Sequence, residues 1–293
     1  MIPIEISHIT RYRYRRKVRL NPHRFLLRPR ESRSLRVVSH DLSCTPDASV
    51  DWSQDVFGNS IAVASFREAA EELVIDSRLA LAHGEPDWPV FPISASAASF
   101  PFSYSEDERA DLGLLATPWS LDPEGALAAW AKGFVASDPT DTISLLKDVN
   151  AGAGMGVRYE ARDDYGTQSP LATLHRRAGS CRDIATLFAE AVRAVGFGAR
   201  LVSGYLRDDG SGRIGAAGPG STHAWADVYL PGAGWVAFDP TNQRVGAGHL
   251  IPVAVARSVE QIPPVSGGYQ GAPEDYLAMS VEVATRVASP GKP

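Results

Sequence analysis

Three residues of the types that build a nucleophilic site are Cys181, His223 and Asp239. Cys181 follows Ala-Gly-Ser, and the residues after it are apolar at steps of three and one, the pattern of a helix with one buried face. Such a helix would begin at Ser180 and hold the thiol in its first turn, where unpaired backbone N–H groups favour an anion. A buried, inert cysteine is the alternative, and the cysteine alone does not decide between the two.

His223 and Asp239 fall on two strand patterns joined by the turn residues Pro-Gly-Ala-Gly. An even number of residues separates them, so a hairpin with an odd-length loop centred near Pro231 would bring both side chains to one face. A carboxylate that accepts from one imidazole nitrogen fixes the tautomer and leaves the other nitrogen for a thiol. The pattern predicts Cys181 as nucleophile, His223 as base and Asp239 as the orienting acid.

An acyl-transfer site also needs hydrogen-bond donors for the oxyanion. The backbone N–H of Cys181 is the first candidate. For the second we favour Tyr159 over Gln168, because Gln168 lies just before a predicted helix. A purely structural tyrosine is the alternative at position 159.

Three further side chains could contact a substrate. Trp225 and Trp235 could form the wall of an acyl-binding cleft, although aromatic residues on strands more often pack in the core or at an interface. Arg182 could hold the thiolate or an acidic group of the substrate, and a solvated arginine is the alternative.

The sequence patterns around these residues predict an α+β protein with four segments. Residues 1–85 alternate in hydrophobicity and predict an N-terminal antiparallel β-domain, with strands in 4–14, 35–44, 60–66 and 73–81. Residues 86–120 are rich in proline and predict a linker. Residues 121–250 predict a catalytic core of helices followed by strands, and 251–293 predict strands that return to a sheet before a frayed tail.

Composition excludes several classes of protein. The 293 residues are 44% hydrophobic and 22% charged, with a net charge of -5, as in ordinary soluble domains. No stretch resembles a signal peptide or a membrane span, so we expect a cytoplasmic protein that does not bind membranes. The two cysteines lie far apart without metal-ligand spacing, so we expect thiols rather than a disulfide, and neither metal nor cofactor.

Arginine and lysine crowd residues 11–36 and could form a nucleic-acid patch. They alternate with apolar residues, however, and no known nucleic-acid motif accompanies them. We therefore interpret them as the solvated face of strands and expect no nucleic-acid partner.

Residues 179–241 resemble the transglutaminase-like superfamily, in particular bacterial members described as candidate cysteine proteases. The resemblance rests on AGSCRDIATLFAEAVRAVGFGARLVSGYL, on THAWADVYLPGAGWVAFDPTN and on the later HLIPVAVARSVEQIPPVSGGYQG. It implies a papain-like α+β core in which a helix bearing Cys181 packs on an antiparallel sheet bearing His223 and Asp239. The N-terminal HITRYRY and LRPR stretches are similar to the β-domain of this bacterial subgroup. Many members carry Gln and Phe-Ala-His after the cysteine, which this chain lacks.

These observations favour an enzyme that acts on peptide or carboxamide substrates through a thioester, which water or an amine resolves. We favour hydrolysis, because nothing in the sequence marks a lysine-binding site. A non-catalytic peptide-binding or assembly module is the alternative. An arylamine acetyltransferase ranks third, since its Arg-Gly-Gly motif is missing. The sequence predicts neither the substrate nor the oligomeric state.

Overall fold

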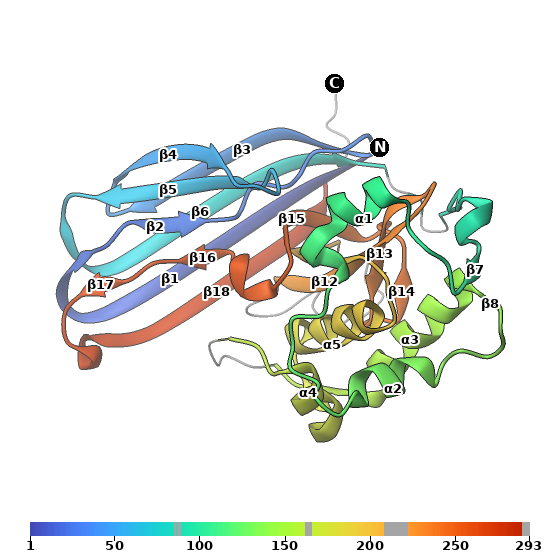
Figure 1. Ribbon diagram of the computed structural model, residues 1–293. Helices are drawn as coiled ribbons and strands as arrows, with labels where there is room; N and C mark the ends of the chain where they lie inside the picture. Colours follow the sequence, from blue (N-terminus) through green and yellow to red (C-terminus); the bar gives the residue numbers. More distant parts are fainter. Residues whose placement is uncertain (85, 87–88, 162–165, 208–221, 289–293) are drawn as a thin grey trace.

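A two-sheet β-sandwich lies beside an α+β core in the computed structural model, which describes residues 1–84, 86, 89–161, 166–207 and 222–288 (Figure 1). The larger sheet has the order β17-β1-β6-β3, with β18 also paired to β1, and the smaller one β16-β2-β5-β4. The strands of the larger sheet are β1 (Ile2–Leu20), β3 (Leu35–Thr45), β6 (Ala69–His83), β17 (Tyr269–Gln270) and β18 (Tyr276–Val287). Those of the smaller sheet are β2 (His23–Phe25), β4 (Ala48–Gln54), β5 (Ser60–Phe66) and β16 (Val265–Ser266).

Hydrophobic alternation explains which side of each sandwich strand is buried. Along β1, Ile4, Ile6 and Tyr14 are buried, whereas Arg11 and Arg13 point to the other face. The arginines near the N-terminus therefore include a row on the outer face of a sheet. The hydrophobic pattern predicts neither β4, whose sequence ASVDWSQ is largely polar and exposed, nor the three-residue β2.

The C-terminal segment contributes strands to both the sandwich and the core. β15 (Leu250–Ala256) pairs with β11 in the sheet of the core, whereas β18 pairs with β1 from Ile4 to Tyr14. The core is thus inserted between the first and last strands of the sandwich. The two ends of the described chain meet there, where Ala288 donates a backbone hydrogen bond to Pro3.

The proline-rich stretch predicted as a linker contains short elements that pack on the core. They are η1 (Ala95–Ala97), β7 (Ser99–Phe100), α1 (Glu106–Leu112) and η2 (Gly113–Ala116). The rings of Phe100 and Phe102 contact Phe197, at centroid distances of 5.5 and 5.6 Å. The hydroxyl of Tyr104 donates to the Tyr229 carbonyl, which anchors the stretch to the sheet of the core.

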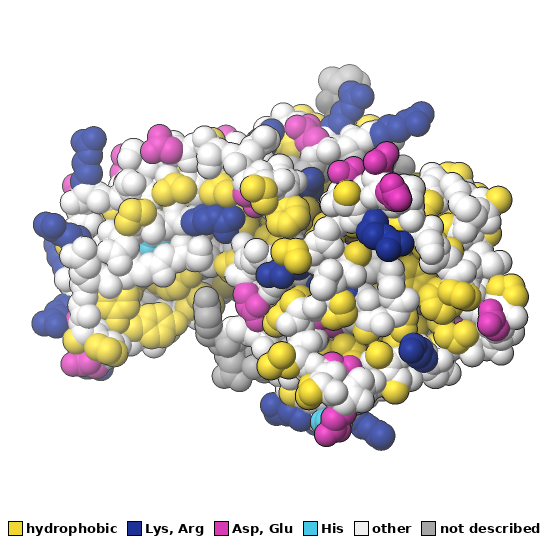
Figure 2. Space-filling view, in the orientation of Figure 1, with side chains coloured by type: hydrophobic (Ala, Val, Ile, Leu, Met, Phe, Trp, Pro, Cys, Tyr) yellow, Lys and Arg dark blue, Asp and Glu magenta, His cyan; other side chains and the backbone are white. Residues whose placement is uncertain are grey.

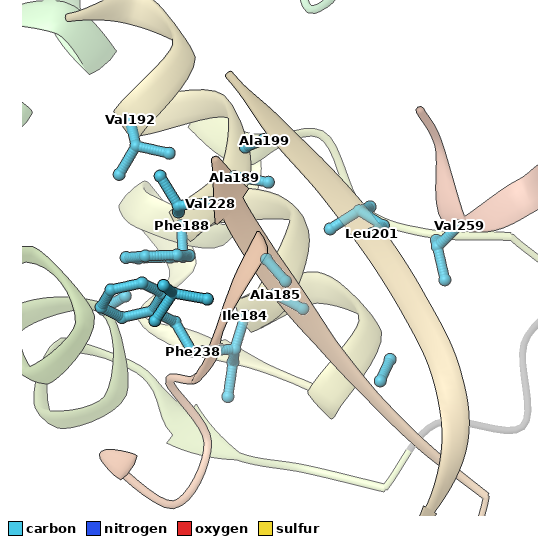
Figure 3. Close-up of a cluster of buried hydrophobic side chains, with 14 of the residues drawn as sticks. Ile184, Ala185, Phe188, Ala189, Val192, Ala199, Leu201, Val228, Phe238 and Val259 are labelled. Carbon is cyan, nitrogen blue, oxygen red and sulfur yellow. The ribbon is translucent and has the colours of Figure 1, made fainter. Parts of the chain in front are cut away.

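The core is built around helix α5 (Cys181–Ala194), which lies on an antiparallel sheet of order β14-β13-β12-β11-β15. The other strands of this sheet are β11 (Ala199–Leu206), β12 (His223–Leu230), β13 (Gly234–Asp239) and β14 (Arg244–Val245). Figure 3 shows Phe188 of α5 beside Phe238 of the sheet, and their ring centroids lie 5.3 Å apart. Burial of this apolar face fixes the position of the whole helix.

Three further helices pack around α5. They are α2 (Ala126–Lys132), α3 (Thr142–Gly156) and α4 (Pro170–Arg176). Pro170 occupies the first turn of α4, as expected. Arg177 ends the helix in a left-handed conformation, with φ of 52°, and Gly179 belongs to the short strand β10 (Ala178–Gly179). β10 pairs in parallel with β9 (Arg158–Tyr159).

A buried ion pair holds the far end of α5. The Arg193 guanidinium lies 2.6 Å from the Glu190 carboxylate, and both side chains are fully buried. Arg193 also donates to the Ala199 carbonyl, and Glu190 accepts from the backbone N–H groups of Trp119 and Ser120. The pair therefore ties α5 to β11 and to the proline-rich stretch.

The sandwich and the core meet along the edge of β15. The side chain of Asn59 donates to the Val255 carbonyl and accepts from the Val255 N–H, at 2.8 and 2.9 Å. It thereby takes the place of a neighbouring strand. No helix in the described part of the chain is long and apolar enough to cross a membrane.

Replacement of Glu190 by alanine should destabilise the fold. It leaves the Arg193 charge buried without its partner, which should cost about 3–5 kcal/mol of the free energy of unfolding. Urea denaturation measures this loss. Glu106→Ala, at an exposed position of α1, should cost less than about 1 kcal/mol. Equal losses in the two variants would show that the ion pair does not hold α5.

Candidate active site

Cys181 is the first residue of α5, and a tight turn fixes the start of this helix. The carboxylate of Asp183 accepts from the backbone N–H and the hydroxyl of Ser180, at 2.8 and 2.9 Å. Burial alone would raise the pKa of Asp183, but the N–H groups of Gln168 and Ser180 hold it below its usual value. Asp183 is thus an ionised cap that fixes the first turn, and the backbone N–H groups there favour an anionic sulfur.

His223 is the first residue of β12, and its ring is buried beside Asp239 at the end of β13. Nε2 donates to Oδ2 of Asp239 at 2.9 Å. The loop has an odd length, as predicted, but its centre is Gly232 rather than Pro231, because Leu230 pairs with Gly234. Asp239 therefore reaches His223 diagonally across the two strands.

The other imidazole nitrogen is left for the thiol. Nδ1 of His223 is buried and makes no hydrogen bond within the described residues. The imidazole of His223, the backbone N–H of Ala224 and the charge of Arg182 all favour the anionic form of the Cys181 sulfur. Burial alone would raise the pKa of Cys181, but these interactions lower it below its usual value. The arrangement favours a thiolate paired with an imidazolium.

Asp239 stabilises the charged imidazole. Burial would lower the pKa of His223, but the charge and hydrogen bond of Asp239, together with Cys181, raise it to about 10. Burial would likewise raise the pKa of Asp239, which His223 and Asn242 instead hold below its usual value. Each of the three groups therefore favours the charged form of its neighbour and compensates the burial of that charge.

Sequence reasoning missed Asn242, which supports the carboxylate. Its side-chain amide donates to Oδ2 of Asp239 at 2.8 Å, and its backbone N–H donates to Oδ1 at 3.3 Å. The signal was present in the sequence, since Asp-Pro-Thr-Asn after a strand is typical of a turn in which the aspartate side chain accepts from the backbone.

Tyr159 and Arg182 both lie close to the thiol. The parallel register of β9 and β10 pairs Tyr159 with Gly179, two residues before Cys181. Burial raises the pKa of Tyr159, and so does the nearby charge of Cys181, whereas Arg182 opposes the rise. Arg182 is half-buried and contributes to the low pKa of the thiol. The roles of both residues toward a substrate stay predictions.

Trp225 is only 1% exposed and lies against the imidazole. The ring centroids of Trp225 and His223 are 6.1 Å apart, with 26° between the planes. A Cβ on Gly204 would collide with the backbone carbonyl of Ile251 and with the Trp225 ring, so the glycine allows both to approach β11 closely. Trp235 lies elsewhere, with its ring 4.3 Å from the Arg200 guanidinium.

Gln168 is engaged in the support of the first turn. Its side-chain amide donates to the Ala178 carbonyl at 3.0 Å, and its backbone N–H donates to Asp183 at 2.7 Å. Within the described residues, no group of three histidine, cysteine, aspartate or glutamate side chains could hold a metal ion. Both Cys44 and Cys181 are free thiols.

Comparison with family models and curated sequences identifies relatives of both the sandwich and the core. Residues 4–81 match the bacterial transglutaminase-like N-terminal region, and residues 128–240 match the transglutaminase-like superfamily. An uncharacterized protein of Mycobacterium tuberculosis is 29% identical over 291 residues, which cover 95% of this chain and 91% of the relative. A protein-glutamine gamma-glutamyltransferase of Pseudomonas aeruginosa is 32% identical over 91 residues, 29% of this chain and 12% of that protein.

A solved structure shares the whole arrangement. A candidate cysteine protease from Cytophaga hutchinsonii superposes with a TM-score of 0.75 over 100% of this chain and 93% of the other. The two sequences are 18% identical, so this likeness shows the fold. The sandwich and the core thus occur together in another bacterial protein.

Iodoacetamide at neutral pH should modify Cys181 much faster than Cys44. Both thiols are half-buried, but the pKa of Cys181 is lowered, whereas burial raises the pKa of Cys44 to about 11. Peptide mapping by mass spectrometry measures the two rates. His223→Ala removes the imidazolium and should slow the labelling of Cys181 toward that of Cys44. Equal labelling of the two thiols in the unaltered protein would contradict an activated cysteine.

The pH dependence of this labelling should move in Asp239→Asn. Without the carboxylate the pKa of His223 falls and that of Cys181 rises, so the thiolate forms at higher pH. We expect the rise in labelling rate to shift upward by about one to two pH units. Asp227→Asn is the matched control, because Asp227 lies on β12 but pairs with Arg200 at 3.0 Å. A profile that moves equally in both variants would rule out the specific action of Asp239.

Proposed function

Because the chain belongs to the transglutaminase-like superfamily, we propose that it transfers or hydrolyses acyl groups of peptide or carboxamide substrates through Cys181, His223 and Asp239. The observation that carries this proposal is a buried imidazole that bonds through Nε2 to a buried carboxylate and leaves Nδ1 without a partner, close enough to Cys181 to lower the pKa of the thiol. That arrangement supplies a nucleophile, a proton carrier and an orienting group in one place.

In the first half of the reaction, the sulfur anion of Cys181 attacks the carbonyl carbon of the substrate. The carbonyl electrons move to oxygen, and the backbone N–H of Cys181, with the hydroxyl of Tyr159 as second donor, stabilises the oxyanion. The imidazolium of His223 then gives its Nδ1 proton to the leaving nitrogen. Ammonia or an amine departs, and a thioester on Cys181 remains.

In the second half, the neutral imidazole removes a proton from water or from an amine that attacks the thioester. Collapse of the tetrahedral intermediate expels the sulfur anion and restores the ion pair with His223. Throughout both halves, the bond from Nε2 to Asp239 keeps Nδ1 directed at the sulfur. Trp225, stacked on the imidazole, limits rotation of the ring.

We favour water as the acceptor. Arg182 follows the nucleophile directly and places a positive charge beside it. A protonated lysine side chain that approaches the thioester would be repelled by this charge. Water, which carries no charge, meets no such barrier.

Incubation with a library of glutamine-containing peptides should identify the reaction. Mass spectrometry is expected to show water added at a carboxamide or at a peptide bond, and the same products should dominate when a primary amine is present. Products that carry the amine would instead indicate a transglutaminase. Cys181→Ser and His223→Ala should lose activity by several orders of magnitude, since removal of either member disables the nucleophile.

The same experiment tests the non-catalytic alternative. A protein that binds library peptides but yields no product, and that shows no fast labelling of Cys181, would be a binding or assembly module. If the peptides are recovered unchanged but Cys181 is labelled fast, the offered sequences are not substrates of the protein. The evidence for an activated thiol would then still stand.

A further inference from the structure

The first half of β18 is an exposed sheet edge without the usual protection. β18 pairs with β1 alone among the described strands, so its other edge is unpaired. Its residues 276–281, YLAMSV, include no charge, proline or glycine. Tyr276, Leu277 and Met279 are 45%, 51% and 47% exposed. Figure 2 shows hydrophobic surface gathered at the lower left, at the end of the sandwich where β18 begins. Soluble proteins normally block such an edge with charge, proline or a covering element.

The inner face beside this edge is a patch of tyrosines, consisting of Tyr12, Tyr14, Tyr269 and Tyr276. The register places Met279 beside Tyr12 and Tyr276 beside Tyr14. Tyr14 packs on Tyr269 with ring centroids 4.9 Å apart. The short edge strand of the smaller sheet, β16, has two residues and leaves Met279 and Tyr276 exposed. Exposed tyrosine and methionine are typical of protein-binding surfaces.

The outer face beside the same edge is basic. The register places Ala278 beside Arg13 and Ser280 beside Arg11. Because Ser280 is small, Arg11 can extend past β18 toward a strand added at its edge. Arg13 lies 3.4 Å from Glu72 on the opposite side, whereas Arg11 pairs with no acid among the described residues.

The second half of β18 leads toward the candidate active site. Val283 packs against the core, and the hydroxyl of Thr285 donates to the Leu206 carbonyl at 3.0 Å. Leu206 ends β11, the strand that pairs with His223 through Gly204. From Met279 to Thr285 the strand covers about 20 Å. A chain that lay along the free edge would therefore point at the core near His223.

We propose that the edge of β18 at residues 276–281 docks an extended, acidic and apolar segment of the protein substrate as an added strand. Backbone hydrogen bonds to β18 supply affinity in this mode of binding, and alternate side chains supply specificity. Apolar residues of the segment face the tyrosine patch, and acidic residues face Arg11. That the segment belongs to a substrate rests on the proposed function; the docking itself does not.

Charge argues against a second copy of the chain as the occupant. Two β18 edges paired antiparallel would bring Arg11 and Arg13 of both copies to the same face. Glu282 is the single acid of β18 and lies beside Ile9, the neighbour of Arg11 on the same face, so each copy would bring one acid against two arginines. The like charges would repel, whereas an acidic segment neutralises them.

Fluorescence anisotropy with labelled peptides on Cys181→Ala tests the proposal without interference from turnover. A short peptide of alternating valine and glutamate should bind, and one of alternating valine and lysine should bind more weakly. Arg11→Glu in the same background should weaken binding of the acidic peptide at least about fivefold and strengthen binding of the basic peptide. Arg36→Glu makes the same change of charge on β3, at the opposite edge of the sheet, and should leave both affinities unchanged.

Two measurements separate this proposal from the proposed function. Iodoacetamide labelling of Cys181 in a protein that carries only Arg11→Glu should keep its rate, because Arg11 is not part of the site. If the acidic peptide binds selectively but the unaltered protein turns over no peptide of the library, the docking site is supported and only the proposed enzymatic function is contradicted. Absent binding, or equal loss in Arg11→Glu and Arg36→Glu, would overturn the docking site. So would a dimer in sedimentation that Met279→Lys abolishes.

Discussion

The candidate site depends on the burial of three charges that compensate one another. A sulfur anion, an imidazolium and a carboxylate each lose solvation in the interior, and none would stay ionised there alone. The bond from His223 to Asp239 and the contact of the thiol with the imidazole repay that cost. The order of the three groups also gives each a separate task, because Nε2 of the imidazole bonds to Asp239 and Nδ1 is left for the thiol.

Rigid supports hold this series of charges in place. The buried pair of Glu190 and Arg193 anchors the far end of α5, and the cap formed by Ser180 and Asp183 fixes its first turn. Asn242 holds the carboxylate from behind. Functional groups held from two sides by packed elements retain a precise geometry, which catalysis by proximity requires.

The sandwich and the core are joined by hydrogen bonds as well as by the chain. Its larger sheet is completed by the last strand of the chain, so the core is inserted into the sandwich rather than joined to its end. Asn59 and β18 then connect the two bodies, at Val255 and at Leu206. This arrangement lets one strand carry an exposed binding edge at one end and contact the core near His223 at the other.

Local patterns in the sequence determined much of this protein. Alternation of apolar residues predicted β1, β3, β5 and β6, and helical spacing after Ser180 predicted α5 with Cys181 in its first turn. An even separation within a hairpin placed His223 and Asp239 on one face. These features depend on residues close in the chain, where backbone geometry sets the period.

Only the tertiary structure decided the rest, since it arises from contacts between distant residues. The polar strand β4 forms by pairing with β5, and the edge of β18 depends on its return to β1. The pairing of Leu230 with Gly234 sets the centre of the hairpin at Gly232, and Trp225 stacks on His223 among side chains from other strands of the sheet. The position of the thiol beside the imidazole follows from how α5 packs on the sheet. Packing is set by the shapes of many side chains at once, and no local pattern in the sequence encodes it.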